Sequence, residues 1–190
     1  MEIEPCYIVS KLRMICDTME EYKLKAKNNI ILTGMPGSGK STVGVILAKE
    51  FCMGFIDTDV IIQAEENMTL QEIVDNRGLE ALLTLEERTV TKLAVTSTVI
   101  APGGSVVLSE KAMKSLKRSG IIVFLDVPIE LIIHRIDMYI RGIIKQPGDT
   151  LEDVWRQREP LYHHYADVTI ECGTMDQMEI AKHIIKRVVA

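Results

Sequence analysis

A glycine-rich stretch from Gly34 to Ser41 contains the residue types that bind polyphosphates. It reads Gly-Met-Pro-Gly-Ser-Gly-Lys-Ser and matches the pattern G-x-x-x-x-G-K-[ST]. The glycines let successive backbone N–H groups converge on phosphate oxygens, the lysine reaches the β- and γ-phosphates, and the hydroxyl coordinates Mg²⁺. We therefore expect the loop to bind a nucleoside triphosphate. The residues expected to contact it are Gly34, Gly37, Ser38, Gly39, Lys40, Ser41 and Thr42.

Three aspartates at the ends of apolar runs are candidates for binding a metal ion and a substrate. Gly54–Asp57 predicts a short strand followed closely by Asp59, and Ile121–Asp126 predicts another strand that ends in an aspartate. Ligands of open parallel sheets gather at the carboxyl ends of the strands, which would place these carboxylates beside the phosphate loop. From spacing alone, a turn or helix cap explains Asp57 and Asp59 equally well, and Asp126 is a rival candidate for Mg²⁺.

Two further segments could face a ligand. Gly103 and Gly104 follow a predicted strand and allow the backbone to approach a substrate closely, although a plain turn would use them as well. The segment from Met138 to Asp149 lacks helical periodicity and carries Arg141. It predicts either a mobile, positively charged lid over the phosphates or an inert surface loop.

Alternating strands and helices position these residues. Apolar runs predict strands over Asn29–Thr33, Gly54–Asp57, Thr98–Ala101, Ile121–Asp126 and Val168–Ile170. Periodicity and capping residues predict helices over 41–50, 79–96, 109–118 and 128–137, and helices opened by caps at Thr69–Glu72, Thr150–Asp153 and Thr174–Gln177. The alternation predicts an α/β fold with helices on both faces of a parallel sheet.

The composition excludes several classes of protein. The chain has 190 residues, a hydrophobic content of 47% and a formal net charge of -5, which fit one α/β domain and argue against disorder. We find neither an apolar run of membrane-spanning length nor a signal peptide, so we expect a cytoplasmic protein without a membrane partner. We also find no basic patch beyond ordinary helix surfaces, so we expect no nucleic-acid partner.

The residues before the first strand follow the pattern of an amphipathic helix. Apolar residues recur at helical spacing with charges between them, at Val9, Leu12, Ile15, Met19 and Tyr22. Such a helix would pack on the domain or on a partner subunit, and a linker remnant is the alternative. We expect an N-terminal helical extension over residues 1–28, one catalytic domain over residues 29–190, and a monomer or weak homo-oligomer.

From Asn29 to Cys172 the chain resembles the shikimate kinases, within the wider group of P-loop small-molecule and nucleoside monophosphate kinases. The resemblance rests on Gly34–Ser41, Phe55–Asp59, the Gly103–Gly104 turn, and the Arg-Glu-Pro-Leu-Tyr sequence of Arg158–Tyr162. It implies a three-layer αβα P-loop kinase domain with sheet order 2-3-1-4-5 and a lid segment. It also implies ATP and Mg²⁺ as cofactors and shikimate, an anionic hydroxylated acid, as the small-molecule substrate.

The resemblance further implies roles for individual residues. Asp57 would hold Mg²⁺ together with Ser41, which favours Asp57 over Asp126, and Arg135 would stack on adenine. Lys40, Asp59 and Arg141 would be catalytic, with Asp59 as the general base. The residues expected to bind the substrate are Asp59, Gly103, Gly104, Arg141 and Arg158. Arg158 suits a carboxylate because its planar guanidinium can bind bidentately.

The chain departs from the family pattern in its acceptor half. The family usually presents a second carboxylate-binding arginine on the long helix, and this position falls on Thr84. Arg88, four residues on, lies on the same helical face and is a candidate replacement. The usual three-glycine turn reads Gly103-Gly104-Ser105, which adds a side chain near the substrate, and the Arg-Pro of the lid becomes Arg141-Gly142.

Three functional hypotheses follow. The first is an ATP-dependent kinase that phosphorylates a ring hydroxyl of shikimate. The second keeps the kinase but changes the acceptor to another small hydroxylated acid or polyol, because the acceptor half carries the departures. The third, from a different class, is an ATP-binding regulatory module with little catalysis. The joint presence of Lys40, Asp57, Asp59 and Arg141 argues against the third.

Overall fold

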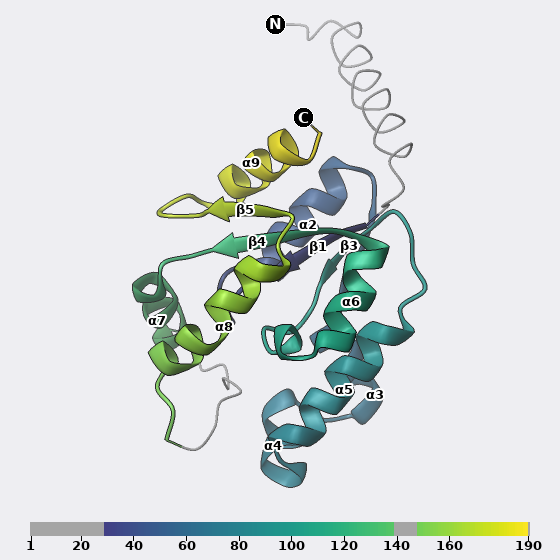
Figure 1. Ribbon diagram of the computed structural model, residues 1–190, viewed down its shortest axis with the longest axis vertical. Helices are drawn as coiled ribbons and strands as arrows, with labels where there is room; N and C mark the ends of the chain where they lie inside the picture. The colour runs from purple at the N-terminus through teal and green to yellow at the C-terminus, as the bar shows by residue number, and fades with distance from the viewer. Residues whose placement is uncertain (1–28, 139–147, 190) are drawn as a thin grey trace, which may run out of the picture.

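The structure is a computed structural model that describes residues 29–138 and 148–189. Five parallel strands form one sheet in the order β2-β3-β1-β4-β5 (Figure 1). The strands are β1 (Asn29–Thr33), β2 (Gly54–Asp57), β3 (Thr98–Ala101), β4 (Gly120–Asp126) and β5 (Val168–Glu171). The predicted strands and sheet order are therefore confirmed.

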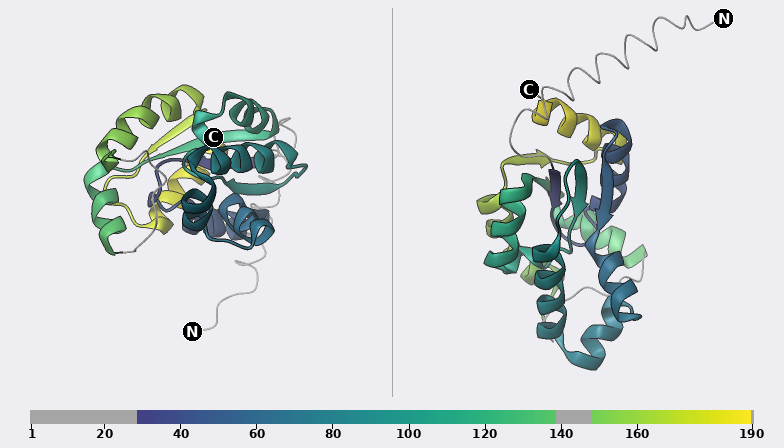
Figure 2. Two further views of the ribbon diagram at one scale, coloured as in Figure 1. Left: turned by 90° about the horizontal axis from the view of Figure 1, so that it is seen from below. Right: turned by 90° about the vertical axis from the view of Figure 1, so that its right-hand side faces the viewer.

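Helices cover both faces of the sheet. They are α2 (Lys40–Glu50), α3 (Thr58–Glu66), α4 (Leu70–Arg77), α5 (Leu79–Lys92), α6 (Glu110–Ser119), α7 (Ile129–Met138), α8 (Leu151–Tyr165) and α9 (Gln177–Val189), with a 3-10 turn over Val106–Leu108. Helices α2 and α9 pack together on one face, and α6 and α8 lie on the other (Figure 2). This arrangement is the expected three-layer α/β fold.

The central strand β1 is buried on both faces, which explains its unbroken apolar sequence. Ile30 and Leu32 belong to the core cluster that includes α2 and α9, whereas Ile31 belongs to the cluster formed with α5 and α6. Because successive side chains of a strand point to opposite faces, this one strand contributes to both halves of the core.

A smaller core holds together the helices α3, α4 and α5, which project beyond the sheet (Figure 1). Ile62, Ile73, Leu82 and Leu85 are buried there, one or two from each helix. The capping box predicted at Thr69–Glu72 opens α4, and another opens α8 at Thr150 and Asp153. No helix in residues 29–138 and 148–189 is long and apolar enough to cross a membrane.

Some element boundaries differ from the sequence prediction. Helix α5 ends at Lys92, before the predicted Thr96, because Asn29 Nδ2 donates a 2.8 Å hydrogen bond to the Val95 carbonyl and Asn29 Oδ1 accepts from Thr98 N. These bonds hold the chain before β3 in a non-helical path. The predicted N-terminal helix over residues 1–28 and most of the predicted lid, including Arg141, lie outside the described residues.

The cap of α9 was also placed on the wrong residue. Asp176 Oδ1 accepts from Glu179 N, and Glu179 Oε2 accepts from Asp176 N. The capping pair is therefore Asp176 and Glu179, two residues later than the predicted Thr174–Gln177. Asp is as good a cap as Thr, so both positions matched the capping pattern and the tertiary structure chose between them.

Candidate active site

The phosphate-binding loop connects β1 to α2, and its last two residues, Lys40 and Ser41, are the first two of that helix. Gly34, Gly37 and Gly39 have positive φ angles of 146°, 81° and 92°, which residues with a Cβ rarely adopt. Lys40 Nζ donates to the carbonyls of Gly34 and Met35, at 2.9 Å each. The lysine therefore lies along its own loop, at a helix N-terminus suited to phosphate.

Burial lowers the pKa of Lys40 to about 8, although Asp59 and Asp57 favour its charged form. Glu86 also attracts the ammonium, and Arg158 repels it. One lysine thus interacts electrostatically with groups from four other segments of the chain. A phosphate anion beside Lys40 would favour the charged ammonium and offset its desolvation.

Asp57 has two roles that the sequence analysis treated as alternatives. Its Oδ2 accepts a 2.6 Å hydrogen bond from Ser41 Oγ, and its Oδ1 accepts one of 3.0 Å from Asp59 N, which caps α3. It is therefore both a helix cap and a partner of the phosphate loop. Mg²⁺ usually binds one or two protein oxygens together with phosphates and water, so the oxygens of Ser41 and Asp57 fit that ion.

Asp126, the rival metal candidate, has different neighbours. It ends β4 beside β5, and its backbone carbonyl accepts from Cys172 N at 2.8 Å. Burial, and next the Asp126 carboxylate, raise the pKa of the Cys172 thiol to about 12. The contacts of Asp126 are thus with Cys172, next to β5, whereas Asp57 contacts the phosphate loop.

Gly103 lies between the carboxylates of Asp59 and Glu86. A Cβ added at this position would clash with Glu86 Oε1 and lie 2.8 Å from Asp59 Oδ1. Its N–H donates to Thr58 Oγ1 at 3.3 Å. Only glycine leaves room here, so the turn after β3 does more than reverse the chain: it brings Asp59 on α3 close to Glu86 on α5.

Glu86 is a site residue that the sequence analysis missed. It is 1% exposed, and Ser105 Oγ lies 2.8 and 2.6 Å from its two carboxylate oxygens. Burial raises the pKa of Glu86 to about 7, and Asp59 adds to this, while Ser105, Arg158 and Lys40 oppose it. A usable signal was present, because Glu86 lies four residues after Leu82 on the apolar face of α5, where a charged residue is costly.

Arg158, expected to bind the acceptor carboxylate, lies close to other charged groups of the site. It lies on α8, is 3% exposed, and interacts electrostatically with Lys40, Glu86 and Tyr162. A buried guanidinium in this group of charges is able to bind an anionic substrate. On the nucleotide side, Arg135 Nη1 donates to the Gly37 carbonyl at 3.4 Å, so α7 reaches the phosphate loop.

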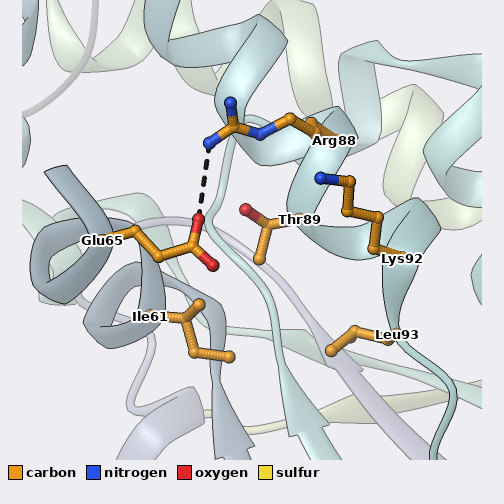
Figure 3. A pocket seen from close by; sticks show the side chains of 6 residues that line it. All are labelled: Ile61, Glu65, Arg88, Thr89, Lys92 and Leu93. Atoms are coloured by element: carbon orange, nitrogen blue, oxygen red, sulfur yellow. Dashed lines mark hydrogen bonds and ion pairs between the residues drawn. The ribbon is translucent and has the colours of Figure 1, made fainter.

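The proposed replacement arginine faces another groove. Arg88 pairs with Glu65 and Glu66 at 3.4 and 3.3 Å, in a groove between α3 and α5 with a volume of about 230 Å³ (Figure 3). The groove is lined by Ile61, Glu65, Arg88, Thr89, Lys92 and Leu93, and apart from Arg88 none of these was a candidate for the active site. The prediction that Arg88 replaces the missing arginine is therefore wrong.

The side chains at two other departures form hydrogen bonds within the protein. Thr84 is exposed, and its Oγ1 donates to the Glu80 carbonyl at 2.8 Å, within its own helix. Ser105 is buried and directs its hydroxyl to Glu86. The added side chain of the turn is thus used to hold a carboxylate.

Comparisons with known proteins point to one family. The profile of the family described as shikimate kinase matches residues 36–189. The chain is 34% identical over 163 residues to a shikimate kinase of Clostridium botulinum, covering 84% of this chain and 98% of that protein. It is 34% identical over 162 residues to a shikimate kinase of Thermoanaerobacter pseudethanolicus, covering 83% and 94%.

Solved structures give the same result. The shikimate kinase of Acinetobacter baumannii in complex with shikimate superimposes with a TM-score of 0.81 at 28% identity, covering 90% of this chain and 97% of that chain. The shikimate kinase of Aquifex aeolicus gives a TM-score of 0.72 at 29% identity, covering 83% and 94%.

Proposed function

The chain belongs to the shikimate kinase family, and we propose that it transfers the γ-phosphoryl group of ATP to a ring hydroxyl of shikimate. The observation that carries this proposal is the charge cluster in which Lys40 interacts with Asp59 and the buried Arg158. The three residues come from α2, α3 and α8. They bring together a phosphate-binding cation, a candidate base and a candidate carboxylate-binding group.

The reaction forms a bond between the acceptor hydroxyl oxygen and the γ-phosphorus and breaks the bond from that phosphorus to the ADP oxygen. Asp59 orients the attacking hydroxyl and takes its proton. Lys40 stabilises the charge on the phosphoryl oxygens, because phosphoryl transfer depends mainly on positioning and charge neutralisation. Arg158 fixes the acceptor carboxylate, and Arg141, outside the described residues, would bridge phosphate and acceptor.

Ser41 and Asp57 would hold Mg²⁺, which when bound neutralises charge on the β- and γ-phosphates. The 2.6 Å hydrogen bond between these two side chains supports the assignment, since it shows that both oxygens point to the same place. Arg135 beside Gly37 supports its assignment to the nucleotide half. Gly103 and Gly104 would present backbone groups to the acceptor.

A second acceptor is favoured by one observation. Thr84 is exposed and Arg88 faces the α3–α5 groove, so neither supplies the second carboxylate-binding cation of the family. Losing such a charge-assisted contact weakens acceptor binding by about 1.5 to 3 kcal/mol, or roughly ten- to a hundredfold. The second candidate is therefore a kinase for another small hydroxylated acid that Arg158 alone can hold.

Steady-state ADP release with Mg·ATP, with and without shikimate, tests the proposal. Saturable stimulation with a KM below roughly 1 mM would support shikimate as the physiological acceptor. Stimulation by a different hydroxylated acid, with no response to shikimate, would favour the second candidate. ATP binding without stimulation by any acid or polyol in a panel would refute both and favour the regulatory module.

A further inference from the structure

Tyr162 connects the acceptor half to the phosphate loop. This tyrosine of α8 is 1% exposed, and its hydroxyl donates a 2.6 Å hydrogen bond to the Gly104 carbonyl. The hydroxyl also interacts electrostatically with Arg158, one helical turn earlier. Tyr162 therefore joins the candidate carboxylate-binding arginine to the turn that follows β3.

Gly104 contacts the phosphate loop on its other side. A Cβ added to Gly104 would lie 2.8 Å from Pro36 Cδ and 3.2 Å from Pro36 N. Pro36 lies within the phosphate loop, two residues after Gly34. Gly104 is thus held between Pro36 and Tyr162, and a continuous set of contacts leads from Arg158 to the nucleotide site.

The ring of Tyr162 has little freedom to change this arrangement. It stacks on Phe124 of β4, with ring centroids 5.1 Å apart and an interplanar angle of 18°. Burial raises the pKa of Tyr162 well above its usual range, so the hydroxyl keeps its proton and remains a donor to Gly104. The stacked ring fixes the direction of the hydroxyl, and the proton fixes the direction of the hydrogen bond.

We propose that Tyr162 is a positioning residue that couples acceptor binding to nucleotide binding. This proposal of coupling rests on the kinase function proposed above. A nucleotide bound in the loop restricts the motion of Pro36, and Pro36 in turn restricts Gly104. Tyr162, hydrogen-bonded to Gly104, then restricts Arg158. Whichever substrate binds first therefore orders part of the site for the second. The coupling is reciprocal, so the acceptor must tighten nucleotide binding by the same factor.

Tyr162→Phe tests this coupling because it keeps the stacked ring and removes the hydroxyl. The dissociation constant of shikimate is measured with and without a non-hydrolysable ATP analogue, and the ratio of the two values is the coupling factor. We expect shikimate to bind ten- to a hundredfold more weakly to the variant, because the Gly104 carbonyl loses its donor and Arg158 loses its neighbouring hydroxyl. We expect the coupling factor to fall toward one, while the analogue alone binds within about twofold of its wild-type affinity.

Tyr165→Phe is the matched control on the same helix. The Tyr165 hydroxyl makes no hydrogen bond within the described part of the chain, so both shikimate constants should stay at the wild-type values. A Tyr162→Phe variant that keeps the full coupling factor would overturn the proposal, and so would a wild-type factor of one. If wild-type protein binds the analogue but no acid or polyol, the proposed function fails instead.

Gly104→Ala tests the same coupling through the contact between Gly104 and Pro36. The new methyl group would press on Pro36, so it should reduce the coupling factor without removing any side chain that holds the acceptor. This variant keeps the proposal testable if Tyr162→Phe folds poorly. Unchanged coupling in Gly104→Ala would contradict the route through Pro36.

Discussion

Ser41 Oγ donates a 2.6 Å hydrogen bond to Asp57 Oδ2, and this contact joins the phosphate loop to the start of α3. The same carboxylate caps α3 through Asp59 N. Asp57 thereby sets where Asp59, two residues on, begins its helix. The Asp57 carboxylate therefore contacts both Ser41, the other candidate metal ligand, and Asp59, the candidate base.

Asp57→Asn should separate the capping role from the metal role. Asparagine caps helices as well as aspartate does, so we expect the free energy of unfolding to change by less than about 0.5 kcal/mol. Activity should fall, and the Mg²⁺ concentration for half-maximal rate should rise at least about tenfold, because a neutral amide is a poorer ligand for Mg²⁺. Asp57→Ala should lose the cap as well, at about 1 kcal/mol. An unchanged Mg²⁺ titration in Asp57→Asn would refute the metal assignment.

Asp59→Asn should abolish turnover without affecting the nucleotide. The amide cannot accept a proton from the acceptor hydroxyl, and general-base catalysis contributes typically about 10²- to 10⁴-fold to rate. We expect kcat to fall by this order while the dissociation constant of ATP, measured by calorimetry, stays within about twofold. Turnover at the wild-type rate would show that another group accepts the proton.

Arg158 and Arg88 form a matched pair of substitutions. Arg158→Lys keeps the charge but loses the planar fork, so we expect the acceptor KM to rise roughly ten- to a hundredfold with little change in the KM for ATP. Arg88→Lys alters an exposed ion pair in the α3–α5 groove, and surface pairs contribute little, so both KM values should remain unchanged. Equal effects of Arg158→Lys on the two substrates would rule out its assignment to the acceptor.

Glu86 should make stability depend on pH. Its pKa is raised from 4.5 to about 7 by burial, so the folded protein binds a proton that the unfolded chain releases between these values. The contribution of this proton to the free energy of unfolding is fully present below pH 4.5. It is lost as the pH rises from 4.5 to 7, and the loss is at most about 3 kcal/mol. Glu86→Gln should flatten the unfolding free energy across this window in urea titrations.

The exposed Glu80 on the same helix provides the control. Glu80→Gln should retain the wild-type pH dependence, because this substitution leaves the buried Glu86 and its contact with Ser105 intact. If Glu86→Gln showed the same slope as wild type between pH 4.5 and 7, another group would have to carry the linkage.

Sequence reasoning worked best where the physics is local. The predicted bounds of the strands Gly54–Asp57 and Thr98–Ala101 match the structure at both ends. Each is a short apolar run flanked by glycine or polar residues, which leaves few alternative boundaries. The capping boxes at Thr69 and Thr150 were also found, since each depends on residues three apart. The end of α5 was missed because Asn29, far away in the chain, decides where that helix stops.

The active site was predictable in part for the same reason. Lys40 belongs to a short motif whose spacing predicts phosphate chemistry. The spacing of Asp57 and Asp59 fits a metal site or a helix cap, and only the family resemblance implies their roles. Glu86 and Tyr162 act through residues that are distant in sequence, namely Ser105, 19 positions away, and Gly104, 58 positions away. No local pattern states which distant partner a buried polar side chain will meet.

The sequence by itself determined the phosphate loop, the alternation of strands and helices, and the family resemblance, because each depends on neighbours along the chain. Only the tertiary structure decided that Arg88 faces the α3–α5 groove and that Glu86 faces the acceptor half. The two residues are two positions apart on α5, where the helical rotation of 100° per residue points them to different sides. Which side meets the active site depends on how α5 packs against α3 and α6, and that packing involves the whole domain.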